Sequence, residues 1–212
     1  MICASIAEKD VDKCIETLNK VEMAEIRIDL AEFSNDKIRL VFSRRKKTIA
    51  TCRPGKIREE ERMEMLKVAI ESGATFIDIE YDAPPGYKTE LIDFAHKHQC
   101  DVIISYHNYN KTPELDELEE IVRNCYAQGA DLAKIATYVN MNRDNSKILS
   151  LYKDPGRLVA IGMGDLGRIS RIVAPFLGAE FTYAALSDNE ATAPGQISYE
   201  KMNRFIMEIQ QI

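Results

Sequence analysis

The chain has 212 residues, a formal net charge of −6, 45% hydrophobic residues and 29% charged residues, which is an ordinary composition for a globular protein. The negative charge argues against extended nucleic-acid binding, and no apolar run reaches the length of a membrane span. The N-terminus shows no signal-peptide pattern, and five scattered cysteines without a CxxC pair favour a reducing cytoplasm over a disulfide framework.

Extended segments and amphipathic segments alternate along the whole chain. Apolar runs, several with alternating polar residues, predict strands over residues 2–6, 23–30, 48–53, 75–81, 101–105, 131–137, 158–163 and 181–186. Helical spacing predicts helices over residues 10–21, 35–44, 58–72, 88–98, 112–128, 143–152, 169–177 and 199–211. Asp10 and Thr112 are the expected N-caps of two of these helices, Pro155-Gly156 is an expected turn, and residues 187–196 form a polar loop.

This order of elements predicts the fold class. Strands that alternate with helices are parallel, because each helix carries the chain back to the same end of the sheet. Eight such units close into a (β/α)₈ barrel, and we expect one domain over residues 1–212. A doubly wound open sheet is the alternative, but it does not need eight units, and no GxGxxG motif follows the first strand.

Lys134 lies in the middle of the apolar strand 131–137, where a charged side chain is costly. Two interpretations are open from this strand alone. The lysine can lie at an edge and extend its amine into water. Alternatively, it can point into a reaction pocket, where loss of hydration favours the neutral, nucleophilic amine.

Polar residues gather at the carboxyl ends of the predicted strands, where barrels carry their chemistry. These residues, with one methionine, are Glu25, Arg27, Arg53, Glu80, His107, Lys134, Met163 and Arg171. Each could be part of a structural ion pair, such as Glu25–Arg27 or Glu80–Arg53, but eight together indicate a functional site. Lys134 and His107 fall on adjacent strands, which places a candidate imine-forming amine beside a candidate acid/base. The arginines could hold a carboxylate, and no metal-binding motif is present in the sequence.

Seven short segments, in order along the chain, resemble those of the type I 3-dehydroquinate dehydratase family. They are Glu25-Ile-Arg27-Ile-Asp29, Thr51-Cys-Arg53, Asp78-Ile-Glu80-Tyr81, Ser105-Tyr-His107-Asn108, Lys134-Ile-Ala-Thr137, Gly167-Arg-Ile-Ser170-Arg171 and Ala193-Pro-Gly195-Gln196. Each segment alone is weakly specific, but the ordered set spans almost the whole chain and is highly specific.

The resemblance implies a lyase of the shikimate and chorismate pathway of aromatic amino acid biosynthesis. In that family Lys134 would form an imine with 3-dehydroquinate and His107 would move protons, with no cofactor and no metal. Residues implied to bind substrate are Ser5, Glu25, Arg27, Arg53, Arg171, Thr192 and Gln196, and Glu80, Met163 and Tyr183 would line or support the pocket. Arg171 would hold the substrate carboxylate, and Gln196 would belong to a lid. The implied protein is a cytoplasmic homodimer that binds a small molecule, with no nucleic acid and no membrane partner.

The chain departs from the family pattern at a few positions. Ile57 occupies a place where many members carry an acid that orients the histidine, so Glu80 is the next candidate for that role. Asn108 replaces an aspartate, Tyr183 a more usual phenylalanine, and Thr192 a serine. None of these departures changes the lysine or the histidine.

Two other functions are compatible with parts of the sequence. A class I aldolase-type barrel would also form an imine, with the glycine-rich segment 162–167 as a cradle for a phosphorylated sugar. The position of Arg171 and the Pro194-Gly195-Gln196 segment favour the dehydratase instead. A non-catalytic barrel that binds a small acid or a protein is the remaining alternative, and it would bind without turnover.

Overall fold

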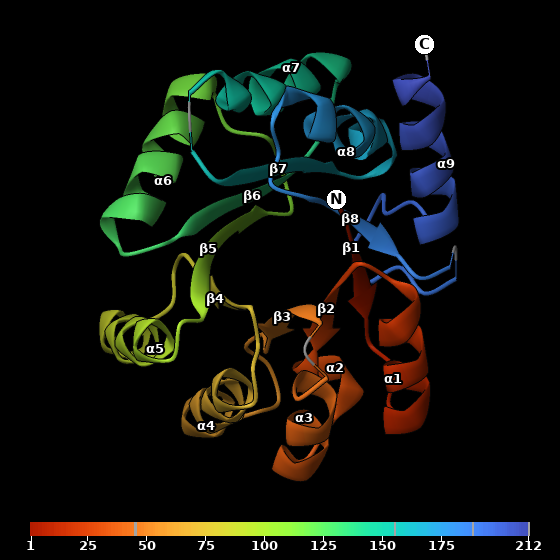
Figure 1. The fold of residues 1–212 in the computed structure, drawn as a ribbon. Helices are drawn as coiled ribbons and strands as arrows, with labels where there is room; N and C mark the ends of the chain where they lie inside the picture. The colour runs from red at the N-terminus through yellow and green to blue at the C-terminus, as the bar shows by residue number, and fades with distance from the viewer. Residues whose placement is uncertain (45, 155, 188, 212) are drawn as a thin grey trace.

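The computed structural model describes residues 1–44, 46–154, 156–187 and 189–211. Its centre is one sheet of eight strands in the order β7-β6-β5-β4-β3-β2-β1-β8, and every neighbouring pair is parallel. The strands are β1 (Ile2–Ile6), β2 (Met23–Arg27), β3 (Lys47–Thr51), β4 (Phe76–Glu80), β5 (Asp101–Asn108), β6 (Leu132–Tyr138), β7 (Leu158–Met163) and β8 (Thr182–Ala185). The sheet curls into a nearly closed barrel (Figure 1), which confirms the predicted fold class.

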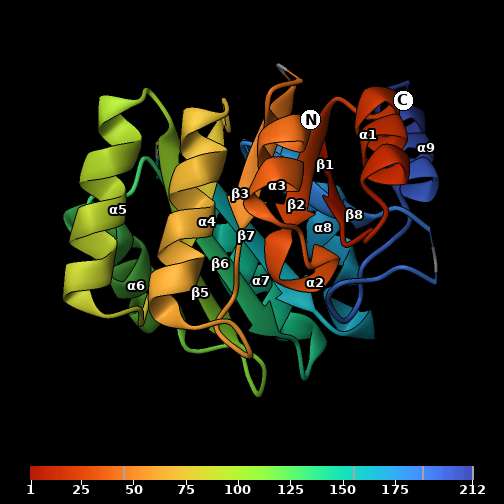
Figure 2. The same cartoon turned by 90° about the horizontal axis from the view of Figure 1, so that it is seen from below.

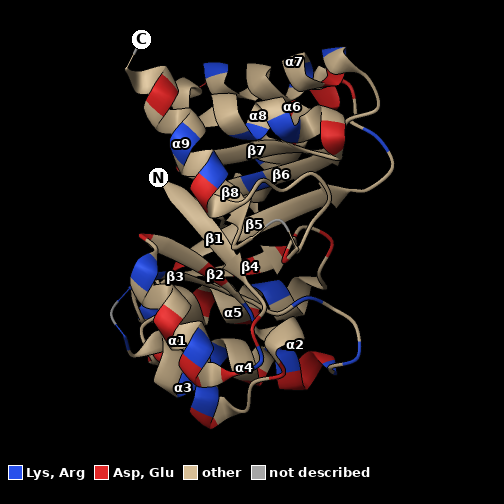
Figure 3. Ribbon diagram, turned by 90° about the vertical axis from the view of Figure 1, so that its right-hand side faces the viewer, with Lys and Arg blue, Asp and Glu red and all other residues tan. Residues whose placement is uncertain are grey.

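Helices surround the barrel (Figures 1 and 2), and the first and last of them lie on the same side. The α-helices are α1 (Val11–Lys20), α2 (Ile28–Ala31), α3 (Asn35–Phe42), α4 (Glu59–Glu71), α5 (Pro85–Lys97), α6 (Leu115–Ala127), α7 (Asn142–Ser150), α8 (Arg168–Val173) and α9 (Tyr199–Gln210). Short 3₁₀ turns are η1 (Leu151–Lys153), η2 (Asp165–Gly167) and η3 (Ala174–Leu177). None of the described helices is long and apolar enough to cross a bilayer, and Figure 3 shows charged residues of both signs along them.

The predicted elements are largely present, with local differences. The expected strand 23–30 ends at Arg27 and turns directly into α2, because Arg27 reaches forward to pair with Asp29 on that helix. Asp10 caps α1 as predicted, since its carboxylate accepts the backbone N–H groups of residues 12 and 13 at 3.0 and 3.2 Å. Pro155, expected in a turn, and Asp188, in the polar loop, lie outside the described residues.

Thr112 does not cap a helix, because α6 begins three residues later at Leu115. Its hydroxyl instead donates to the backbone carbonyl of Tyr138 at 2.9 Å and lies 3.0 Å from the Thr137 hydroxyl. The threonine therefore ties the loop after β5 to the end of β6. This long-range contact replaces the local one that the sequence suggested.

The eight strands separate two hydrophobic clusters, one outside the barrel and one inside it. Their outward residues pack against the helices in the main hydrophobic core. Their inward residues form a second cluster that fills the barrel: Cys3, Met23, Ile49, Phe76, Ile103, Leu132, Ala136, Val159, Ile161, Met163, Phe181 and Tyr183. Two positions beyond the apolar members on β2, β4, β5 and β6, on the same face, are Glu25, Asp78, Ser105 and Lys134. These four polar residues form a layer that lies next to the apolar cluster and nearer the carboxyl ends of the strands.

Candidate active site

Lys134 lies in the polar layer at the middle of β6, and only 5% of its surface is exposed. Its Nζ is 2.9 Å from Asp78 Oδ2 and 3.7 Å from Glu25 Oε1. The same Nζ lies 4.3 Å from the centre of the Tyr183 ring. The structure therefore rules out an edge position with the amine in water, and it shows carboxylates as the direct partners of the lysine, where the sequence analysis emphasised arginines.

Asp78 on β4 is the residue that the sequence analysis left out of the site. Its fully buried carboxylate accepts hydrogen bonds from Lys134 Nζ at 2.9 Å, Ser105 Oγ at 2.6 Å and Arg53 Nη1 at 2.8 Å. Burial opposes the charged form of Asp78, but Arg53 and Lys134 outweigh it and hold the pKa of the carboxyl far below its usual range. Asp78 is thus a fixed negative charge that orients the lysine. The alternating pattern of residues 75–81 places Asp78 on the same face of the strand as Glu80, and this pattern could have indicated Asp78 as a site residue.

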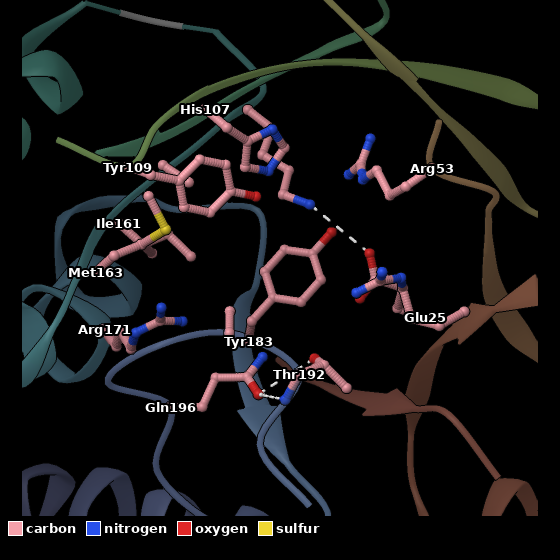
Figure 4. Close-up of a pocket in the computed structure, with 14 residues that line it drawn as sticks. Glu25, Arg53, His107, Tyr109, Ile161, Met163, Arg171, Tyr183, Thr192 and Gln196 are labelled. Atoms are coloured by element: carbon pink, nitrogen blue, oxygen red, sulfur yellow. Dashed lines mark hydrogen bonds and ion pairs between the residues drawn. The ribbon is translucent and has the colours of Figure 1, made fainter. Parts of the chain in front are cut away.

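Glu25 connects the lysine to the loop after β8. Its carboxylate accepts from Ser5 Oγ at 2.6 Å and from Thr51 Oγ1 at 3.0 Å. Ser5 in turn accepts a hydrogen bond from Thr192 Oγ1 at 2.8 Å, and the backbone N–H of Thr192 donates to Gln196 Oε1 at 2.7 Å. Thr192 and Gln196, the residues expected in a lid, therefore line the pocket (Figure 4), and the Thr192 hydroxyl reaches its polar layer through Ser5.

Two glycines allow the loop after β8 to lie close against the end of β7. Gly164 and Gly195 both have positive φ angles, 79° and 77°, and the Gly164 N–H donates to the Pro194 carbonyl at 3.2 Å. A Cβ atom on Gly195 would lie 2.2 Å from the Gly164 carbonyl oxygen, so a side chain there would force the two segments apart. The contact fixes the loop after β8 against the end of β7.

His107 lies on β5 at the mouth of the same pocket, next to β6. Its ring is stacked on that of Tyr109, with 6.0 Å between ring centres and 10° between planes. Burial, helped by the nearby cations Arg53 and Lys134, lowers the pKa of His107 well below its ordinary value. The imidazole is therefore neutral at physiological pH and able to accept a proton.

Arg171, in the last turn of α8, is a buried cation without an ion-pair partner among the described residues. It is 1% exposed, and its Nε and Nη1 atoms have no hydrogen-bond partner among the described residues. Only Nη2 has a contact there, at 3.4 Å from the Pro194 carbonyl. Burial lowers the pKa of Arg171 to about 10, so the guanidinium still carries its charge at neutral pH. Such a group is prepared to receive a carboxylate or another planar anion.

The other predicted site residues divide into two groups. Arg27, Arg53, Met163 and Tyr183 line the pocket. Arg27 pairs with Asp29 at 2.7 Å, and Arg53 pairs with Asp78, so the suggested Glu25–Arg27 ion pair is wrong. Glu80 does not line the pocket; its carboxylate lies 3.9 Å from Arg53 Nη1, as the suggested ion pair requires.

The structure gives Glu80 no contact with His107. The His107 side chain has no hydrogen bond to any residue within the described ranges, and the aromatic ring of Tyr109 is its stacking partner. Burial raises the pKa of Glu80, whose carboxyl group turns toward Arg53. No hydrogen bond or ion pair joins Glu80 to His107 within the described residues, so the orienting role of Glu80 stays a prediction.

The three glycine N–H groups of segment 162–167 donate within the protein. That of Gly162 donates to Ser170 Oγ at 2.7 Å, that of Gly164 to the Pro194 carbonyl, and that of Gly167 to the Gly164 carbonyl at 3.1 Å. Gly162 and Gly167 are packed so closely that a Cβ on Gly167 would lie 2.5 Å from the Gly162 carbonyl carbon. These three amides are therefore not free to hold a phosphate.

Figure 4 shows how these groups face one another. Arg171 lies across the pocket from Arg53 and Glu25, with the Tyr183 ring between the two sides and His107 at the mouth. In chemical terms, the pocket offers a buried amine, a neutral imidazole and an unpaired guanidinium at the carboxyl ends of parallel strands. Among the described residues no group of three or more His, Cys, Asp or Glu side chains is placed to hold a metal ion. The fold and the pocket define a (β/α)₈ barrel suited to a small organic anion.

Comparison with known proteins identifies the family. The chain matches the model of type I 3-dehydroquinase over residues 2–212. It is 36% identical to a 3-dehydroquinate dehydratase of Methanococcus maripaludis, over 97% of this chain and 98% of that protein. The chain belongs to the type I 3-dehydroquinase family.

Solved structures agree with this assignment. The 3-dehydroquinate dehydratase of Aquifex aeolicus superimposes with a TM-score of 0.84 and 27% identity, over 98% of both chains. A type I 3-dehydroquinate dehydratase of Clostridium difficile, solved with covalently modified comenic acid, has a TM-score of 0.87 over 99% of this chain and 92% of that one. At 24% identity, the second comparison supports the fold.

Proposed function

We propose that this chain dehydrates 3-dehydroquinate to 3-dehydroshikimate through an imine on Lys134. The observation that carries the proposal is the placement of the buried Lys134 amine beside a neutral His107, in a pocket whose far side holds the unpaired Arg171 guanidinium. Family membership supplies the substrate, since the curated relative carries the name of this activity.

Binding would begin with the substrate carboxylate at Arg171. The guanidinium has free Nε and Nη1 donors, which match a carboxylate in a bidentate pair. This pairing would place the substrate ring over Tyr183 and its ketone toward Lys134. Hydroxyl groups at the other side of the ring would then face Glu25, Arg27 and Arg53, and the loop carrying Thr192 and Gln196 would exclude water.

The amine of Lys134 would then attack the C3 ketone. Asp78 and Glu25 hold the ammonium in the pocket, and the neutral imidazole of His107 would take one of its protons so that the lone pair can form the new C–N bond. The C=O electron pair moves to oxygen, which takes one proton from the nitrogen and the other back from His107, and it leaves as water when the C=N⁺ bond forms. The cationic imine withdraws electrons and acidifies the hydrogens on C2.

His107 would carry out the proton transfers that follow. As a neutral imidazole it can take a proton from C2, and the electron pair then forms the C1–C2 double bond as the C1 hydroxyl departs. The proton held by His107 is returned to that hydroxyl, which leaves as water. Hydrolysis of the imine frees the conjugated product and restores Lys134. The lysine itself supplies the electron sink, so the proposal assigns no cofactor.

Turnover is measured by the absorbance of the conjugated enone product. Lys134→Ala is expected to abolish it and His107→Ala to lower it by roughly two to four orders of magnitude. Lys67→Ala is the matched control, because Lys67 pairs with Glu90 on the outside of the barrel. Full activity in the Lys134 variant contradicts the proposal, and so does the absence of enone formation by the unmodified protein.

We further propose a single domain, a cytoplasmic location in the shikimate pathway and a homodimer. All five cysteines are free and buried, which suits a reducing compartment.

Exposed apolar side chains lie close together in sequence on η2, α8 and η3, and they would favour self-association: Leu166, Ile169, Phe176 and Leu177. Light scattering on a size-exclusion column measures the mass, and a monomer at micromolar concentration contradicts the dimer.

A further inference from the structure

Tyr183 on β8 has a buried hydroxyl group that the protein does not use. The residue is 2% exposed, and its hydroxyl oxygen has no hydrogen-bond partner among the described residues. Two other tyrosines show the usual arrangement, since the hydroxyl of Tyr152 donates to the Ala160 carbonyl at 3.0 Å and that of Tyr126 to the Arg157 carbonyl at 2.7 Å. An unpaired buried hydroxyl is unfavourable in the free protein, and it therefore needs an explanation.

The position of this hydroxyl group indicates what could pair with it. Tyr183 lines the pocket, and the Lys134 Nζ lies over its ring at 4.3 Å from the centre. Figure 4 shows the hydroxyl pointing away from β8, toward the side of the pocket that holds Glu25. The Glu25 carboxylate accepts hydrogen bonds from Ser5 and Thr51, and the Tyr183 hydroxyl makes none to it. A donor is thus left free beside the amine that would attack the substrate.

The packing of the ring holds this donor in place. The Tyr183 ring meets Phe181 edge to face, with 5.4 Å between ring centres and 71° between planes. On β1, Cys3 is its register partner, and it is fully buried. Because Phe181 packs against the ring of Tyr183, the hydroxyl group is held at one position in the pocket, as a preorganised hydrogen-bond donor requires.

We propose that the Tyr183 hydroxyl donates a hydrogen bond to the substrate oxygen on the carbon that Lys134 attacks. This inference rests on the proposed function. When the Nζ lone pair forms the C–N bond, the C=O pair moves to that oxygen, which gains charge and then a proton to become the carbinolamine hydroxyl. The oxygen is two bonds from Nζ, within the region that the tyrosine faces. Tyr183 keeps its own proton throughout, and the hydroxyl later departs as water when the imine forms.

The role predicts opposite effects of Tyr183→Phe on stability and on chemistry. Removing an unpaired buried hydroxyl leaves the ring packing intact, so the melting temperature of the free protein should stay unchanged or rise. Removing the donor should slow imine formation roughly five- to tenfold, the effect of about one hydrogen bond. Because the bond strengthens as the oxygen gains charge, KM should change less than kcat.

The experiment follows imine formation with 3-dehydroquinate in a single turnover, quenched with borohydride and read as the mass added to Lys134. Tyr126→Phe is the matched control, since it removes a hydroxyl outside the pocket and should leave the rate of imine formation unchanged. An adduct that forms in Tyr183→Phe within twofold of the unmodified rate overturns the inference, and so does a fall in melting temperature that accounts for the lost rate. If the unmodified protein forms no adduct at Lys134, the proposed function itself fails. Adduct formation in the unmodified protein with normal kinetics in the variant rejects the role of Tyr183 alone.

Discussion

Replacing Asp78 with asparagine tests how the buried lysine is held. The carboxylate contacts Lys134, Ser105 and Arg53 at 2.9, 2.6 and 2.8 Å, and its side chain is completely buried. Asparagine can keep an acceptor toward Arg53 and Ser105, but it has no negative charge, and its amide group can place a donor opposite the ammonium. Breaking a buried ion pair from one side costs about 3–5 kcal/mol, because the remaining charge stays buried.

For a chain of this length that loss corresponds to a melting temperature lower by roughly 10 °C. The free energy of unfolding is obtained from urea titrations with linear extrapolation. Asp101→Asn is the matched control, because Asp101 pairs with Arg157 at 2.6 Å while both side chains are more than a third exposed (40% and 39%). An exposed pair of this kind contributes less than about 1 kcal/mol.

The double variant Asp78→Asn/Lys134→Met completes the test. Asparagine leaves the buried ammonium with Glu25 alone, at 3.7 Å, and methionine removes that ammonium. The two losses should therefore not add, and the interaction free energy should be about 1–3 kcal/mol. Strict additivity, or a loss below about 1 kcal/mol in Asp78→Asn alone, would refute the reasoning that this carboxylate holds the lysine by charge.

The remaining predictions concern Arg171 and His107, whose pKa values are lowered by burial. Arg171→Met should stabilise the free protein by a few kcal/mol at most, because burial lowers the pKa of the guanidinium to about 10, which corresponds to roughly 3 kcal/mol against the charged form. The same change should raise KM at least tenfold through loss of the carboxylate pair, whereas Arg168→Met, at an exposed pair with Asp165, should alter neither unfolding nor kinetics. For His107, whose pKa is lowered in the folded state, the unfolded chain binds the proton first as the pH falls below 6.5. The free energy of unfolding should therefore be highest above pH 6.5 and fall below it, and His107→Ala should weaken this dependence on pH. The acid limb of the kcat/KM profile should also lie below pH 6.5. An acid limb above that value contradicts the assignment of His107 as the proton acceptor.

The sequence predicted the architecture because each element carries its own local pattern. The apolar runs and the amphipathic helices between them give strand–helix alternation, and alternation in turn requires parallel strands. The same period-two pattern placed Asp78 and Glu80 on one face of β4, although it could not separate their roles. In the structure Asp78 contacts the lysine, whereas the Glu80 carboxylate lies 3.9 Å from Arg53 Nη1 and does not line the pocket.

Contacts between distant parts of the chain could not be predicted in the same way. The hydrogen bond from Thr192 to Ser5 joins residues 187 positions apart, and the sequence supplied only the family resemblance for both. The absence of a partner for Nε and Nη1 of Arg171 among the described residues depends on how the strands and the loop after β8 enclose the side chain. Thr112 was predicted as a helix N-cap from its local sequence, but in the structure its hydroxyl donates to the Tyr138 carbonyl at the end of β6. Local propensity fixes elements, whereas burial and pairing decide which polar residues form the site.

The central claim is that Lys134 forms an imine with the substrate. Incubation with 3-dehydroquinate and borohydride, followed by peptide mass spectrometry, measures this directly, because reduction converts the imine to a stable secondary amine. We expect one added substrate-derived mass on Lys134, and we expect activity to fall in proportion to the fraction of Lys134 that is modified. An unmodified Lys134 in a protein that still turns over substrate, or an adduct on another lysine, would contradict it.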